Sequence, residues 1–391
     1  MGDARPQGKG KGAYRAQTCA WLGQAVRPCT YSDGIRLLRG PSAALGDPRR
    51  AAVAIDALRR GWPVTVQHLD KLLTVMAVET AQDISGAHAM LLSASRAATL
   101  KLTNQRAAAD GDRPVLIKAP ADLNLNLALA IADPSLDLAY PMKGPFAALA
   151  LDDGQSATAA IELARLAGLL PAFLVFYGAH AHPVYVSPLD VSAFDDSGAL
   201  RIAARAKLPV AANADAEIVA FRTAVDASDH VALLMGTRDS SPPVVRLHSE
   251  CLTGDVLGSL KCDCGPQLHE ALQQISDARW GILLYLRQEG RGIGLINKLR
   301  AYALQDQGFD TVDANTRLGF AIDARDFSVA ARMLQLLGVE RVRLLTNNPE
   351  KVSGLQDAGI TVEERLPLKI VANLHNAHYL ETKKSRTGHA L

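Results

Sequence analysis

Three of the five cysteines lie close together in the second half of the chain, at Cys251, Cys262 and Cys264. One residue separates Cys262 from Cys264, so these two thiolates can face one metal ion but cannot readily form a disulfide with each other. Cys251 lies across a glycine-containing loop, which lets the backbone fold back toward the pair. Three thiolates fill three corners of a zinc tetrahedron and leave a fourth for water, as in a catalytic zinc site. The spacing alone also allows three buried thiols, or a structural site that His248 completes.

A glycine-rich segment follows an apolar stretch, residues 281–286, that has the composition of a buried strand. The segment reads Arg287-Gln-Glu-Gly-Arg-Gly-Ile-Gly294. Its glycines let backbone N–H groups approach an anion, and its two arginines supply positive charge. A plain turn has the same composition, so this pattern by itself does not distinguish a nucleotide-binding loop from a turn.

Two further patterns contain residues that could take part in the same chemistry. Tyr302 is expected on one face of a helix with Leu295 and Leu299, where a packing role is the common one. Asp323 and Arg325 form a D-x-R pair in front of another expected helix. Such a pair is usually a helix cap or a surface ion pair.

Lys351 lies in the first turn of a helix that Asn347-Asn348-Pro349 is expected to start, because proline is favoured at the first helical position. The free N–H groups at such a start bind anions, whereas a cation there opposes the helix dipole. A bound phosphate would explain the position of Lys351, and a solvated lysine is the alternative.

The sequence around these residues resembles GTP cyclohydrolase II, the enzyme that opens the guanine ring of GTP at the start of riboflavin synthesis. Four motifs carry the resemblance in the family's order, and it extends over residues 205–391. They are Arg246-Leu-His-Ser-Glu-Cys-Leu-Thr-Gly-Asp-Val-Leu-Gly-Ser-Leu-Lys-Cys-Asp-Cys-Gly265, Tyr285-Leu-Arg-Gln-Glu-Gly-Arg-Gly-Ile-Gly294, Asn297-Lys-Leu-Arg-Ala-Tyr-Ala-Leu-Gln-Asp-Gln-Gly308 and Leu344-Leu-Thr-Asn-Asn-Pro-Glu-Lys351.

The resemblance implies zinc-dependent hydrolysis of GTP to 2,5-diamino-6-(5-phosphoribosylamino)pyrimidin-4(3H)-one, formate and pyrophosphate. The ligands of one Zn²⁺ per chain would be Cys251, Cys262 and Cys264. The catalytic residues would be Tyr302, Asp323 as the proton acceptor, and Arg325, which meets the phosphates. The residues that contact GTP would be Arg246, Leu247, His248, Ser249, Glu250, Gln267, Glu289, Gly290, Arg291, Thr311, Thr346 and Lys351.

The implied reaction has two attacks of water on C8 of the guanine ring, loss of formate, and release of pyrophosphate from the triphosphate. Zinc lowers the pKa of bound water and so supplies hydroxide near neutral pH, as in the zinc deaminases of nucleobases. Three thiolates donate more charge to zinc than three imidazoles, so a nearby base such as Asp323 or Tyr302 would help. Arg325, Lys351 and Mg²⁺ would neutralise the departing pyrophosphate.

The first half of the chain resembles 3,4-dihydroxy-2-butanone 4-phosphate synthase, through residues 51–61 and 154–169. That family is often fused in front of GTP cyclohydrolase II, and it needs clustered carboxylates and a histidine to hold magnesium. Gln155 stands where the family has the histidine, residues 67–73 contain a single acid, and Phe176-Tyr177 replaces a late glutamate. We therefore expect a degenerate domain without synthase activity.

Interleaved strands and helices predict a mixed α/β (α+β) protein of two domains, each with a mixed sheet flanked by helices. The length of 391 residues also exceeds that of a usual single core. The expected parts are a flexible tail at residues 1–35, the synthase-like domain at 36–200 and the cyclohydrolase domain at 205–391. Helices of the first half are expected at residues 49–60, 85–95 and 157–166.

The composition, 48% hydrophobic and 21% charged, is that of an ordinary globular protein, and the net charge of +2 decides nothing about nucleic acid. A zinc-ribbon module for nucleic acid would need a second C-x2-C pair and a basic stripe, and the sequence has neither. No apolar run reaches the ~18 residues of a membrane helix, no secretory signal follows Met1, and so few cysteines fit a reducing cytoplasm. We expect a cytoplasmic homodimer that binds GTP and has neither nucleic acid nor a membrane as a partner.

Three other functions stay open at this point. A cyclohydrolase fold that has lost turnover would be a GTP-binding regulator. A related cyclohydrolase would act in another pathway or stop at the formylated intermediate. A working first half would make the chain bifunctional.

Overall fold

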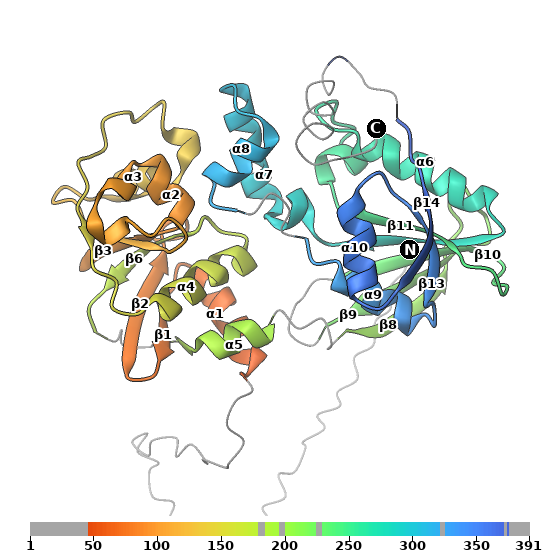
Figure 1. Cartoon of the computed structure of the whole chain (residues 1–391), viewed down its shortest axis with the longest axis horizontal. Helices are drawn as coiled ribbons and strands as arrows, with labels where there is room; N and C mark the ends of the chain where they lie inside the picture. Colours follow the sequence, from red (N-terminus) through yellow and green to blue (C-terminus); the bar gives the residue numbers. More distant parts are fainter. Residues whose placement is uncertain are drawn as a thin grey trace, which may run out of the picture. The chain divides into compact units, whose positions relative to one another are not determined.

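The computed structural model describes residues 46–178, 184–194, 200–223, 229–320, 325–370 and 374. It contains two seven-stranded mixed sheets flanked by helices, which confirms the predicted α/β fold class (Figure 1). Both sheets belong to one compact unit, residues 44–391. The tail predicted at residues 1–35 lies outside the described residues, and the domain boundaries at 200 and 205 stay predictions.

The first sheet is built by the N-terminal half in the order β5-β4-β3-β6-β2-β1-β7, and only the β1–β7 pairing is parallel. Its strands are β1 (Val64–His68), β2 (Lys71–Ala77), β3 (Ala87–Leu92), β4 (Val115–Lys118), β5 (Ala148–Leu149), β6 (Ala172–Phe176) and β7 (Val184–Val186). One face packs against α1 (Pro48–Arg59), α4 (Gly154–Ala167) and α5 (Pro188–Phe194). The other face packs against α2 (Ala94–Thr99), α3 (Leu125–Ala132) and the 3₁₀ turns η1 (Leu102–Asn104) and η2 (Arg106–Ala108). The turn η3 (Pro134–Leu136) follows α3.

The helices predicted at residues 49–60 and 157–166 are confirmed as α1 and α4, but the helix predicted at residues 85–95 is wrong. Strand β3 occupies that segment and pairs with both β4 and β6. Met90, Leu91 and Leu92 are all fully buried, because a central strand covered by helices on both faces is apolar throughout. The helix begins only after Ser93, whose hydroxyl accepts a hydrogen bond from the backbone N–H of Arg96.

The second sheet is built by the C-terminal half in the order β14-β13-β11-β12-β10-β9-β8. Its strands are β8 (Arg201–Lys207), β9 (Glu217–Arg222), β10 (Asp229–Gly236), β11 (Val244–Ser249), β12 (Trp280–Leu286), β13 (Arg341–Leu345) and β14 (Thr361–Leu366). The four strands β12, β11, β13 and β14 are mutually parallel, and the remaining pairings are antiparallel. Helix α6 (Cys264–Asp277) packs on one face, and α9 (Ser328–Leu336) and α10 (Pro349–Asp357) pack on the other (Figure 1).

Helices α7 (Gly294–Asp306) and α8 (Thr311–Arg317) follow β12 in the chain, yet they pack against the first sheet. Ala301 and Leu304 of α7 and Ala314 of α8 belong to the same apolar cluster as Met90 of β3 and Ile117 of β4. The N-terminal half and this helical pair therefore share one core. Among the residues that the structure describes, no helix is long and apolar enough to span a bilayer.

Candidate functional site

The candidate site lies at the carboxyl ends of three neighbouring parallel strands, β11, β12 and β13. Each strand continues there into a segment that the sequence predicted to be functional: Glu250 and Cys251 after β11, the glycine-rich loop after β12, and Thr346 after β13. The carboxyl ends of parallel strands are where ligands bind in open α/β sheets, because the following loops converge there.

The three cysteines predicted to bind zinc come together. Cys251 follows β11, the π-helix η5 (Leu252–Val256) turns the chain back, and Cys264 begins α6. The sulfur atoms of Cys251 and Cys262 are 3.7 Å apart, and all three sulfurs lie within 4.8 Å of one another. Cys251 and Cys262 are buried, and all three thiols are free.

The sulfur positions match the requirements of a tetrahedral metal ion. Bonds of about 2.3 Å from zinc to sulfur give a tetrahedral edge of about 3.8 Å, close to the observed separation of Cys251 and Cys262. A side-chain carbon on Gly254 would lie 2.8 Å from the Cys262 sulfur and 3.0 Å from the Cys251 sulfur, so only glycine leaves room beside the two sulfurs. Among the described residues no fourth histidine, cysteine or carboxylate joins the group, so the donor set fits a metal ion held by three thiolates.

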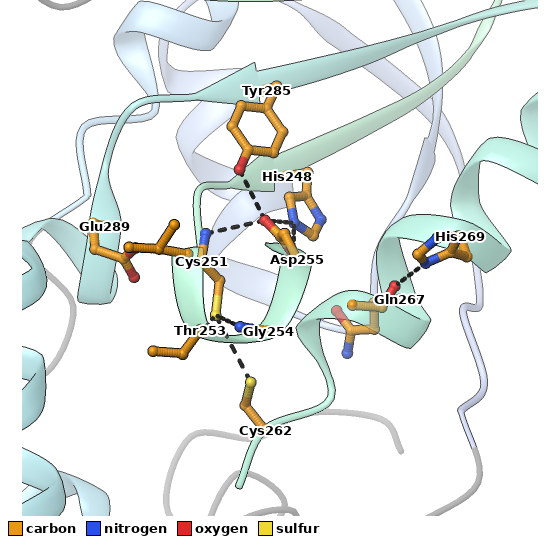
Figure 2. A network of polar contacts seen from close by, with 12 residues as sticks. His248, Cys251, Thr253, Gly254, Asp255, Cys262, Gln267, His269, Tyr285 and Glu289 are labelled. Atoms are coloured by element: carbon orange, nitrogen blue, oxygen red, sulfur yellow. Dashed lines mark hydrogen bonds and ion pairs between the residues drawn. The ribbon is translucent and has the colours of Figure 1, made fainter. Parts of the chain in front are cut away.

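His248, the alternative fourth ligand, pairs with Asp255 instead. Its Nε2 lies 3.0 Å from both carboxylate oxygens, and burial lowers the pKa of this imidazole despite the opposing effect of the carboxylate. Asp255 also accepts hydrogen bonds from the backbone N–H of Cys251 at 3.0 Å and from the hydroxyl of Tyr285 at 2.9 Å (Figure 2). This carboxylate thus joins β11, β12 and the cysteine loop, and it fixes the direction from which Cys251 approaches.

Lys298 of α7 also reaches the cysteine cluster. Its ammonium group lies 3.0 Å from the sulfur of Cys251, 2.8 Å from the hydroxyl of Thr253 and 2.8 Å from the carboxylate of Glu289. Burial opposes the charge, but the hydrogen bonds to Glu289 and Cys251 outweigh it and raise the pKa of Lys298. Hydrogen bonds from Cys262 and Cys264, assisted by Lys298, lower the pKa of the Cys251 thiol. The ammonium group therefore favours a thiolate at Cys251.

One pocket collects nearly all of the predicted site residues. Those that line it are Cys251, Cys262, Cys264, Arg246, His248, Ser249, Glu250, Gln267, Glu289, Gly290, Arg291, Tyr302, Thr311, Arg325, Thr346 and Lys351. Leu247 is buried in β11 and does not line the pocket, although its carbonyl accepts a hydrogen bond from Lys351. Asp323 lies outside the described residues, so its predicted role as the proton acceptor stays a prediction.

Four buried polar atoms of the pocket lining have no hydrogen-bond partner among the described residues. They are Arg246 Nε, His248 Nδ1, Ser249 Oγ and Asn348 Nδ2. The other nitrogens of Arg246 are fixed, because Nη1 donates to the carbonyl of Leu345 at 3.1 Å and Nη2 to Gln267 at 2.6 Å. Burial lowers the pKa of Arg246 to about 10. Buried polar groups are rarely left unpaired, so the four atoms point to a polar ligand.

The glycine-rich loop forms the short 3₁₀ turn η6 (Glu289–Gly292). Gly290 and Arg291 both have left-handed backbone, with φ of +62° and +63°. A side-chain carbon on Gly290 would lie 3.1 Å from Cβ of Lys298, so this glycine is required for the close approach of α7. Left-handed backbone costs energy at Arg291, and such strain is concentrated at functional sites.

Lys351 is 5% exposed, which excludes the solvated lysine that the sequence left open. Its ammonium group donates to the carbonyl of Leu247 at 2.7 Å. Asn348 caps α10 by accepting a hydrogen bond from the N–H of Glu350, and its own N–H donates to the hydroxyl of Thr346. The start of this helix is therefore held rigidly beside the pocket.

Sequence reasoning did not assign to the site five polar residues that line the pocket, namely Lys298, Gln305, Asn315, Asn347 and Asn348. Lys298 lies four residues before Tyr302, and this spacing places both side chains on one face of a helix. That spacing was a usable signal, because a lysine one helical turn from a candidate catalytic tyrosine reaches the same pocket.

Comparisons with known proteins identify a family. The family model for GTP cyclohydrolase II matches residues 201–367. A GTP cyclohydrolase-2 from Azospirillum brasilense is 40% identical over 387 residues, which cover 92% of this chain and 99% of that protein. A GTP cyclohydrolase-2 from Cronobacter sakazakii is 56% identical over 193 residues, which cover 49% of this chain and 98% of that protein. The first relative thus aligns with nearly the whole chain and the second with about half of it.

A solved structure also matches, but at a low level. The crystal structure of RibBX, a two-domain 3,4-dihydroxy-2-butanone 4-phosphate synthase from A. baumannii, matches with a TM-score of 0.27 and 17% identity, over 82% of this chain and 100% of that chain. A likeness this low supports no conclusion, so the synthase character of the first half rests on the sequence motifs alone.

Proposed function

Because the chain belongs to the GTP cyclohydrolase II family and is a hydrolase of that family, we propose that it hydrolyses GTP with a zinc ion held by Cys251, Cys262 and Cys264. The products would be 2,5-diamino-6-(5-phosphoribosylamino)pyrimidin-4(3H)-one, formate and pyrophosphate, as in riboflavin synthesis. One observation carries the proposal: the three converging thiols share a pocket with four buried polar atoms that lack partners.

The charge of the pocket supports an anionic substrate. Five cationic side chains line it, against the two carboxylates of Glu250 and Glu289. The five cations are Arg246, Arg291, Lys298, Arg325 and Lys351. A concave site with this excess of positive charge attracts a polyanion such as a triphosphate.

The part of the pocket beside the cysteines would bind the guanine base. Because Nε2 of His248 donates to Asp255, Nδ1 carries the free lone pair and can accept a hydrogen bond from the ligand. Arg246 Nε and Ser249 Oγ add a donor and a hydroxyl beside it. Rigidly held donors and acceptors of this kind select a heterocycle by its polar edge.

The start of α10 and Arg325 would bind the phosphates. Asn348 caps that helix and Lys351 lies in its first turn, where backbone N–H groups and the helix dipole favour an anion. Arg325 lines the same pocket and would meet the charge that develops on pyrophosphate as it leaves. Mg²⁺ would arrive with the triphosphate and share this neutralisation.

Tyr302 would act as a hydrogen-bond donor at neutral pH. Burial raises the pKa of its hydroxyl, although contacts with Thr253 and Lys298 partly offset the effect. A phenol with a raised pKa stays protonated, so the proton acceptor would have to be another group, and Asp323 is our candidate. Zinc held by the three thiolates would supply a Lewis acid beside the base.

The test is to incubate the purified protein with GTP and Mg²⁺ and to measure formate, pyrophosphate and the diaminopyrimidine. We expect all three products in equal amounts, together with about one zinc per chain. The Cys264→Ser variant should lose both zinc and turnover. GTP binding without formate would show that the protein is a regulator, and full zinc occupancy in Cys264→Ser would overturn the metal assignment.

The homodimer and the cytoplasmic location remain proposals that rest on the sequence. The presence of three free, partly buried thiols is consistent with a reducing compartment. Sedimentation analysis of the purified protein would test the homodimer, and fractionation of cells would test the location.

A further inference from the structure

We propose that the N-terminal half positions helix α7, and through it Lys298 and Tyr302, and that Arg300 is the residue that makes this connection. The proposal gives the degenerate half a role in the reaction of the other half. The kinetic test of this proposal measures formate release and therefore rests on the proposed function. The structural test measures deuterium exchange in α7 and does not rest on it.

Arg300 joins α7 to two acidic residues of the N-terminal half. Its Nε donates to the carboxylate of Asp133 at 2.8 Å, and its Nη1 donates to the carboxylate of Glu79 at 3.1 Å. The three side chains are 16%, 7% and 14% exposed, respectively. Both carboxylates are held by their own domain, because Glu79 accepts from the N–H of Leu170 and Asp133 from the N–H of Ser135. Arg300 therefore binds a fixed pair of charges.

Asn297, one turn before Arg300, adds a second polar connection. Its amide nitrogen donates to the carbonyl of Gly168, at the end of α4, at 3.1 Å, and its amide oxygen accepts from Arg300 at 2.9 Å. The residue is completely buried. A buried amide with both ends occupied fixes the rotation of the helix, because any other rotation would leave a buried polar group unpaired.

Apolar packing completes the interface. Ile293, Leu304 and Leu318 belong to the cluster that also contains buried side chains of the first sheet. Gly319, after α8, approaches the N-terminal half so closely that a side-chain carbon would lie 2.6 Å from Pro171 and 2.7 Å from Ser93. A substitution at this glycine would therefore act as a wedge between the two halves.

A neighbouring side of α7 faces the candidate site, and Ala301, which also belongs to the shared apolar cluster, lies between the two sides. The residues of α7 that line the pocket are Lys298, Ala301, Tyr302 and Gln305, whereas Asn297, Arg300 and Leu304 contact the N-terminal half. The two sets alternate along the same turns, so the helix cannot rotate or slide at one face without moving the other. Displacing a catalytic group by about 1 Å can reduce a rate about 100-fold.

The central experiment compares Arg300→Met with the wild-type chain. We expect kcat for formate release to fall about 10- to 100-fold while the Kd for GTP stays within about three-fold, because β11 and α10 are untouched. Deuterium uptake should rise in residues 294–306 and stay unchanged in β12. Arg300→Lys keeps one positive charge and should recover part of kcat. The matched control is Arg222→Met, which removes an exposed ion pair with Asp229 in the second sheet.

A second pair of variants tests the interface without removing a charge. Gly319→Ala and Gly308→Ala both place alanine at positive φ, +89° and +98°, but only Gly319 faces Pro171 and Ser93, whereas Gly308 has open space. We expect Gly319→Ala to lower kcat and to raise deuterium uptake in α7. Gly308→Ala should show only the loss of stability that comes from alanine at positive φ.

Two results would overturn the proposal. One is an Arg300→Met variant with wild-type kcat and wild-type exchange in α7. The other is exchange that rises equally in α7 and β12, which would mean that Arg300 only stabilises the whole fold. If the wild-type chain releases no formate from GTP, the proposed function fails. Deuterium exchange and zinc affinity, measured for each variant, still decide whether the N-terminal half positions α7.

Discussion

Lys298→Met removes an ammonium group that contacts both a candidate zinc ligand and a largely buried carboxylate. Lys298 and Glu289 are each 11% exposed, so they form a largely buried ion pair. Removing one partner of such a pair typically costs about 3–5 kcal/mol, because the other charge stays buried without compensation. The N–H groups of Leu252 and Gly290 still donate to Glu289, so we expect the lower end, about 3 kcal/mol of unfolding free energy.

The same substitution should weaken zinc binding. Lys298 lies 3.0 Å from the sulfur of Cys251 and favours its thiolate form, which is the form that binds metal. Loss of a group that orients or charges a metal ligand usually lowers metal affinity about 10- to 100-fold. Competition for zinc with a chromophoric chelator measures this affinity, and urea denaturation of the zinc-loaded and zinc-free protein measures the stability.

Lys261→Met is the matched control for this variant. Both ammonium groups lie over the ring of Tyr302, at 5.3 Å for Lys261 and 5.8 Å for Lys298. In the described part of the chain, however, the ion-pair partner of Lys261 is the exposed carboxylate of Asp306, and such a pair contributes at most about 1 kcal/mol. If Lys298→Met and Lys261→Met bind zinc with affinities within about three-fold of each other, the assigned role of Lys298 is wrong.

Three further outcomes are expected. Gly254→Ala should lose zinc in metal analysis while Gly258→Ala retains it, because the added carbon meets two cysteine sulfurs at Gly254 and open space at Gly258. Equal zinc contents in the two variants would show that Gly254 is not needed for the cysteines to bind zinc. Asp323→Asn and Arg325→Ala should each abolish formate release while zinc is retained. Near-normal formate release from either variant would mean that the two residues serve only as a helix cap and a surface ion pair. Ribulose 5-phosphate with Mg²⁺ should yield no formate without GTP, and formate above a no-enzyme control would show that the first half is active.

The sequence predicted those parts of the site whose chemistry is concentrated in short segments. The spacing of the cysteines indicated that three thiols can face one ion, and the structure brings their sulfurs together. Lys351 was singled out because a cation at a helix start needs an explanation, and it lies buried in the pocket lining. Asp255 was not singled out, since its partners His248 and Tyr285 come from two different strands that become neighbours only in the sheet. Long-range pairing of this kind leaves no local pattern.

The buried residues of α7 were not predicted for a related reason. Leu295, Leu299 and Tyr302 lie on one face of the helix as expected, but Leu299 is 46% exposed there, whereas Asn297 and Lys298 are buried. Apolar periodicity identifies the buried face of a helix only when the buried side chains are apolar. The buried polar residues of α7 have partners up to 221 residues away, as in the pair of Arg300 with Glu79.

A helix of this kind depends on partners at both of its faces. Asn297 and Arg300 bury polar groups against the N-terminal half, and Lys298 buries a charge against the cysteine cluster. Each of these groups, left unpaired, would cost more than a neutral hydrogen bond returns. The helix is therefore stable in this position only while both sets of contacts are present. That requirement gives a physical reason for the first half to keep its fold, even though residues such as Gln155 predict that it lacks synthase chemistry.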